Sequence, residues 1–194
     1  MCLMERIKEI LVDPVLAITK SKKEKSMNKT LLILILSWIL VGISFLFSYK
    51  SPLLLEKIGF TLSVFLFGIL FSIFYSYLTD IIMKILGGKG KYYDSLTATS
   101  YSSLPISFGL LLMSIVSAIN VTLGLFIGFV AIAVTSALSL SIYFRAIKEF
   151  YGTDMFLTFM GFLIILYVIM IAIYISAAFS MGSTIFQSIS LRFL

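Results

Sequence analysis

Residues 30–49 read TLLILILSWILVGISFLFSY, a stretch with no charged side chain. A helix of about 20 residues rises about 30 Å, which is the thickness of the hydrocarbon core of a bilayer. Four further apolar stretches follow at approximately residues 58–86, 99–119, 121–144 and 155–179. The pattern predicts an all-α integral membrane protein whose core is a bundle of five transmembrane helices.

The composition excludes several classes of protein. Hydrophobic residues make up 60% of the chain and charged residues 12%, against about 45–50% and about 25% in soluble domains. The chain contains no histidine and a single cysteine, Cys2, which excludes an internal disulfide, the usual zinc sites and histidine-based catalysis. We therefore expect a non-enzymatic protein with no metal and no cofactor.

The basic residues predict the orientation. The N-terminal segment and the connections after the second and fourth spans together hold twelve Lys and Arg residues, counting Lys84 with the connection that follows it, and the opposite side holds three. Because cytoplasmic segments carry the excess of Lys and Arg, we expect a cytoplasmic N-terminus and a C-terminus outside. The formal charge of +6 is thus a membrane-topology signal, and we expect no nucleic acid partner.

Residues 1–28 form a separate cytoplasmic segment, ahead of a five-helix domain at residues 29–194. Apolar residues recur at helical spacing from Leu3 to Leu11, with Arg6 among the charged residues of the opposite face, so the segment predicts a short amphipathic helix on the membrane surface. A second short helix is predicted to begin at Asp13-Pro14. A basic run follows: Lys20, Lys22, Lys23, Lys25 and Lys29. These lysines either bind anionic lipid headgroups or form a solvated tether that sets orientation.

Two stripes of small residues predict where the helices pack, because close approach drives association in lipid. In the fourth span the stripe is Gly124, Gly128, Ala131, Thr135 and Ser139, and in the second span it is Gly68, Ser72 and Ser76. The longer stripe predicts that the fourth span is the central helix.

Asp80 is the next member of the shorter stripe and has two interpretations. It forms either an ion pair with Lys84 at a helix end, or part of a polar vestibule open to the cytoplasm. The residues expected to line that vestibule with Asp80 and Lys84 are Tyr101, Ser102, Ser103, Pro105 and Arg145. Pro105 predicts a late start or a kink of the third span, as either a plain structural feature or a functional hinge.

Several short motifs resemble those of the Yip family, the membrane proteins named for interaction with Ypt/Rab GTPases. They are the run Gly87-Gly88-Lys89-Gly90, the stretch from Tyr101 to Pro105 at the start of the third span, the Asp13-Pro14 step, the tight third-to-fourth hairpin and Arg145-Ala146. The resemblance covers almost the whole chain. It implies five spans with a cytoplasmic N-terminus.

Eukaryotic members of the Yip family act in vesicle traffic through Rab GTPases and partner Yip proteins. This chain lacks their longer cytosolic region and their Asp-Leu-x-Gly-Pro element, so it looks more like the prokaryotic relatives. The resemblance therefore implies a protein of a prokaryotic plasma membrane.

Two functions remain open. The first is a membrane scaffold that organises the bilayer or recruits partners, which are lipids, other proteins or further copies of the chain. The second is a small transporter or lipid-handling protein, of the scramblase or permease kind, with the vestibule as its entrance. Coupled carriers usually contain more intramembrane acids than one, which favours the scaffold.

Overall fold

The structure is a computed structural model that describes residues 3–48 and 53–190. Seven helices make up this part of the chain: α1 (Leu3–Val12), α2 (Pro14–Glu24), α3 (Met27–Ser48), α4 (Leu54–Ile85), α5 (Tyr92–Ile119), α6 (Val121–Tyr151) and α7 (Met155–Ser190). Five of them, α3 to α6 and the part of α7 from Met155 to Tyr174, are long and apolar enough to cross a membrane. The predicted helical membrane bundle is confirmed.

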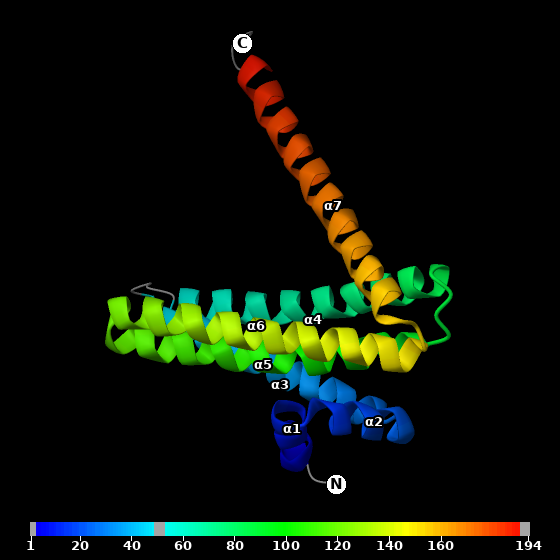
Figure 1. The fold of residues 1–194 in the computed structure, drawn as a ribbon. Coiled ribbons are helices and arrows are strands. Elements are labelled where there is room, and N and C mark those ends of the chain that lie inside the picture. The colour runs from blue at the N-terminus through cyan, green and yellow to red at the C-terminus, as the bar shows by residue number, and fades with distance from the viewer. Residues whose placement is uncertain (1–2, 49–52, 191–194) are drawn as a thin grey trace.

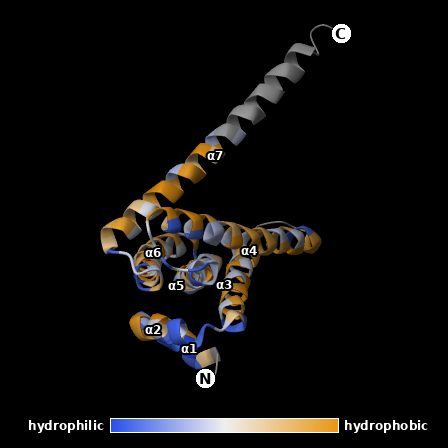
Figure 2. Cartoon of the chain, turned by 90° about the vertical axis from the view of Figure 1, so that its right-hand side faces the viewer, coloured by the Kyte–Doolittle hydropathy of each residue, from blue (hydrophilic) through white to orange (hydrophobic). Residues whose placement is uncertain are grey.

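Four of the long helices lie side by side, and α7 leaves the bundle at an angle (Figure 1). Helix α5 contacts α3, α4 and α6, whereas α7 contacts α4 and α6. The pair α1–α2 lies against one side of the bundle (Figure 1). Figure 2 shows hydrophilic residues concentrated in this pair and in the connections, while the long helices are mostly hydrophobic.

The central helix is α5, so the prediction that the fourth span is central is wrong. The small-residue stripe of α6 faces α5, where a side chain on Gly109 would meet Thr135 and one on Gly128 would meet Met113. Outside this stripe, α6 is largely exposed before Ile142, whereas its last ten residues are largely buried. One stripe gives a helix one close neighbour, whereas α5 carries small and hydroxyl side chains on several faces and so packs against three helices.

The stripe of α4 faces α3 and α5. Gly68 lies against the Trp38 indole of α3, whose Nε1 donates a hydrogen bond to Ser72 Oγ at 2.9 Å. One turn further on, Ser76 Oγ donates to Thr99 Oγ1 of α5 at 3.0 Å. Small residues at these positions therefore permit both close approach and interhelical hydrogen bonds inside the membrane.

Helices α5 and α6 both extend beyond the apolar stretches that predicted them. Helix α5 begins at Tyr92 and continues through Pro105, so the expected late start is wrong. Asp94 closes the first turn by accepting a hydrogen bond from the Lys91 N–H at 2.8 Å, which is a strong local start signal. Helix α6 continues to Tyr151, so the paired ends of α5 and α6 project past the hydrocarbon.

Gly68→Ala tests the α3–α4 packing. The added Cβ would lie 2.0 Å from Trp38 Cε3, and we expect the overpacking to cost about 1–3 kcal/mol. Gly59→Ala is the matched control, because a Cβ there has no neighbour within 4 Å and alanine favours the helix by up to about 1 kcal/mol. Thermal unfolding of the detergent-solubilised protein measures both, and equal midpoints for the two variants would contradict this packing.

Candidate functional site

The site lies where α4 ends, α5 begins and α6 ends. Gly87 has a φ of +87°, a left-handed conformation that glycine adopts without strain, and it turns the chain out of α4. The Gly88 N–H then donates to the Met83 carbonyl at 2.8 Å, and the Lys89 N–H donates to the Tyr151 carbonyl at 3.0 Å. These bonds hold the glycine-containing loop, residues 87–90, against the end of α6.

Asp80 is the central group of this junction. It is 5% exposed, and its Oδ1 accepts a hydrogen bond from the Tyr151 hydroxyl at 2.7 Å. Its Oδ2 accepts one from Lys84 Nζ at 2.7 Å. A buried carboxylate is tolerated when such donors satisfy it, so both oxygens of Asp80 are committed to interactions within the protein.

The Tyr151 ring explains why two glycines follow α4. A Cβ on Gly90 would lie 2.7 Å from the ring, and one on Gly88 would lie 2.9 Å from it, so only glycine fits at both positions. The Tyr151 hydroxyl oxygen also lies 3.3 Å from the Lys91 carbonyl oxygen. We call Asp80, Lys84, Gly88, Gly90 and Tyr151 the Asp80 junction, which joins the ends of three helices.

Hydroxyl groups continue the network into the bundle. Ser95 Oγ donates to the Ser76 carbonyl at 2.7 Å, linking α5 to α4. Thr79 Oγ1 and the Tyr143 hydroxyl, on α4 and α6, are hydrogen-bonded at 2.9 Å. Thr30 of α3 and Thr97 of α5 are bonded through their hydroxyls at 3.1 Å. The polar side chains at this end of the bundle are therefore largely hydrogen-bonded within the protein.

The seven residues expected to line a vestibule are not gathered at one place. Asp80 and Lys84 form the predicted ion pair, but Tyr101 is buried near Ser21 and Arg6 of the N-terminal helices. The remaining members lie elsewhere: Pro105 is buried, Ser102 and Ser103 are half-buried and Arg145 is exposed.

The hydroxyls of the two serines bond within α5. Ser102 Oγ donates to the Thr99 carbonyl at 3.0 Å, and Ser103 Oγ donates to the Ser100 carbonyl at 2.9 Å. Bonds of this kind let hydroxyl side chains sit in a membrane helix without an outside partner.

Arg6 is a second group whose position differs from the prediction. It was expected on the exposed face of α1, yet it is 3% exposed and pairs with Glu24 Oε2 of α2 at 2.7 Å. Glu24 also pairs with Lys29 at 2.7 Å, and this hydrogen bond, followed by the nearby Arg6 charge, lowers the pKa of Glu24. Glu24 is therefore ionised at neutral pH and joins α1, α2 and the start of α3.

The basic run divides into two groups. Lys20 pairs with Glu9, Lys22 Nζ donates to the Glu149 carbonyl of α6 at 2.6 Å, and Lys29 pairs with Glu24. In contrast, the Lys23 and Lys25 side chains are exposed and have no ion pair with any described residue. Three of the five predicted headgroup lysines thus hold α1–α2 in place, and two face outward.

Comparison with known proteins identifies the family of this chain. The family model of the Yip1 domain matches residues 8–186. The chain belongs to the Yip1 domain family. The resemblance found in the short motifs is confirmed, and the match runs from α1 into α7. No curated protein and no solved structure matches the chain.

Tyr151→Phe tests the Asp80 junction of this Yip1 domain. The variant keeps the ring but removes one donor from a buried carboxylate, so we expect a loss of about 2 kcal/mol, which is about 4–8 °C in Tm for a chain of this size. Tyr167→Phe removes the same hydroxyl from a position that is 68% exposed and should leave Tm unchanged. Thermal unfolding in detergent is the measurement, and an unchanged Tm for Tyr151→Phe would contradict the role of this bond.

Proposed function

We propose that this Yip1 domain protein is a non-enzymatic membrane scaffold of a prokaryotic plasma membrane. Its cytoplasmic end presents a fixed surface to protein partners, and the N-terminal helices attach that surface to the membrane. The Asp80 junction carries the proposal, because it ties the ends of α4, α5 and α6 together through a carboxylate with both oxygens bonded. A fully bonded network of this kind favours one rigid arrangement of the helix ends, whereas a gate needs helix ends that move.

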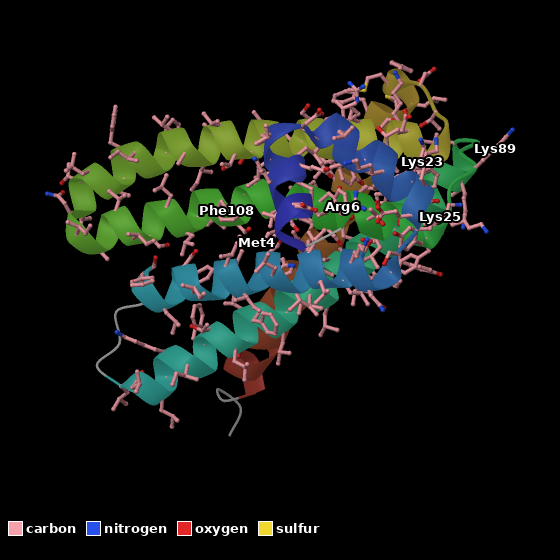
Figure 3. The ribbon with its side chains drawn as sticks, turned by 90° about the horizontal axis from the view of Figure 1, so that it is seen from below. Met4, Arg6, Lys23, Lys25, Lys89 and Phe108 are labelled. Carbon is pink, nitrogen blue, oxygen red and sulfur yellow. The ribbon has the colours of Figure 1, made fainter. Side chains whose placement is uncertain are left out.

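The orientation of the scaffold rests on charge. Lys89, in the connection between α4 and α5, lies at the same end of the bundle as Lys23 and Lys25 of the N-terminal segment (Figure 3), as expected if both are cytoplasmic. The exposed surface at that end includes Lys89, Lys148 and Glu149. A protein partner would meet these mixed charges on a surface whose underlying helices are already fixed.

One observation favours lipid handling as a second candidate. Helices α4 and α7 diverge and leave an apolar groove of about 670 Å³, lined on the α4 side by Phe67, Phe71, Phe74 and Leu78. Val168 and Ile173 lie on the α7 side. The groove is large enough for part of an acyl chain. Among the described residues that line it, however, only Ser176 is polar, so a lipid headgroup that passed through the groove would lose its hydrogen bonds to water without gaining others.

Liposome assays distinguish the two functions. The purified protein is reconstituted into liposomes, and the translocation of fluorescent lipids between leaflets and the leak of ions are measured. A scaffold predicts rates equal to those of protein-free liposomes. A clear protein-dependent rate that falls when Phe71→Trp narrows the α4–α7 groove, but not with Phe126→Trp on the exposed face of α6, would overturn the scaffold.

A further inference from the structure

The α1–α2 pair exposes apolar side chains at one end of its outer surface, although the pair already buries an inner apolar face. Ile10, Ala17 and Ile18 are buried in the core cluster, together with Ala98 and Leu104 of α5 and Ile147 of α6. On the outer surface, Met4 and Val12 are each 75% exposed, and Val15 and Leu16 are also exposed. We call these four residues the outer apolar edge. Charged Glu5, Lys8 and Asp13 are exposed beside it, and such a mixture of apolar and charged residues is typical of a helix at a membrane interface.

The pair lies along the flank of the bundle rather than beyond its end (Figure 1). In the view from below, Met4 lies toward Phe108 in the middle of α5, whereas Lys23 and Lys25 lie toward the end that carries Lys89 (Figure 3). Along the bundle, the exposed Met4 is therefore followed by the exposed Lys23 and Lys25 in the direction of the predicted cytoplasm.

The level of the membrane surface follows from α3. Exposed large apolar side chains on α3 begin at Met27 and Leu32, and residues 31–48 rise about 27 Å, close to a hydrocarbon thickness. Thr30 is bonded to Thr97 of α5, so the surface crosses α5 near Thr97. Helix α2 packs on α6, and its Ser21 lies beside Tyr101 of α5, four residues further into the membrane than Thr97. This places the pair at the depth of the headgroups and the first acyl carbons.

We propose that α1–α2 is an interfacial wedge that binds anionic lipids of the cytoplasmic leaflet. The outer apolar edge inserts among the acyl chains, and Lys23 and Lys25 contact the phosphates above it. The level of the pair favours a leaflet over a protein partner, because at that depth its exposed apolar side chains and lysines meet acyl chains and headgroups. Lys23 and Lys25 have no ion pair with a described residue and are available for lipid, whereas Lys20 joins α2 to α1 and Lys22 and Lys29 hold the pair to α6 and α3. This inference rests on the proposed orientation but not on the scaffold's protein partners.

The depth of the wedge is tested with a single fluorophore. In a Cys2→Ser background, which removes the only cysteine, Val12→Cys is labelled with an environment-sensitive probe in the reconstituted full-length protein. Lys25→Cys is the control. We expect the Val12 probe to be quenched by a lipid spin-labelled high on its acyl chain and the Lys25 probe by aqueous iodide. Iodide quenching of both probes to the same extent would overturn the insertion.

The lipid preference is tested with charge reversals. The probes are spin-labelled phosphatidylglycerol and phosphatidylcholine in mixed bilayers, and the measurement is the ratio of their motionally restricted fractions. Each lysine near an anionic surface is worth about fivefold in association, so Lys23→Glu with Lys25→Glu should remove most of the preference for phosphatidylglycerol. Lys89→Glu with Lys148→Glu makes the same change in net charge on exposed residues outside the wedge and should remove much less.

Both variant pairs change exposed side chains and should fold. An equal loss of preference in the two pairs, or no preference in the unmodified protein, would overturn the lipid site. Either result would leave the scaffold proposal standing, because that proposal is tested by lipid translocation and ion leak.

Discussion

A bilayer offers no water to a backbone amide or to a charge, and this constraint determines the structure. Every long segment is a helix, which satisfies its own backbone hydrogen bonds. Thr97, Thr99 and Ser100 return their hydroxyls to carbonyls one turn earlier. The buried carboxylate at the end of the bundle, Asp80, is retained with two donors. These polar groups are thus kept inside the membrane domain by partners from within it.

Lipid also removes the usual reason for helices to associate, so close contact has to replace it. Gly68 against Trp38 and Gly109 against Thr135 are the positions where this chain brings backbones together. Helix α5 has such contacts on several faces and is central, whereas α7 has few and diverges from the bundle. The fixed part of the molecule is therefore α3 to α6, and both the Asp80 junction and the N-terminal helices are attached to that part.

Local patterns in the sequence predicted much of this fold. Hydropathy predicted the five spans, and spacing predicted the Asp80–Lys84 pair. Tyr151 was missed because it is 71 positions from Asp80, and no local pattern connects the two residues. Arg6 was missed because helical periodicity separates apolar from polar faces but does not show that Glu24 covers a charge. The central position of α5 depends on contacts with three helices, which a stripe on one helix does not reveal.

The central claim is that the chain crosses the membrane five times with its lysine-rich end in the cytoplasm. Reporter fusions at Lys25 and at Leu194 test this claim most directly, using one reporter that is active only inside the cell and one that is active only outside. Five crossings predict that the fusion at Lys25 reports the cytoplasm and the fusion at Leu194 reports the exterior. If both fusions report the same side, the number of crossings is even and the account is contradicted.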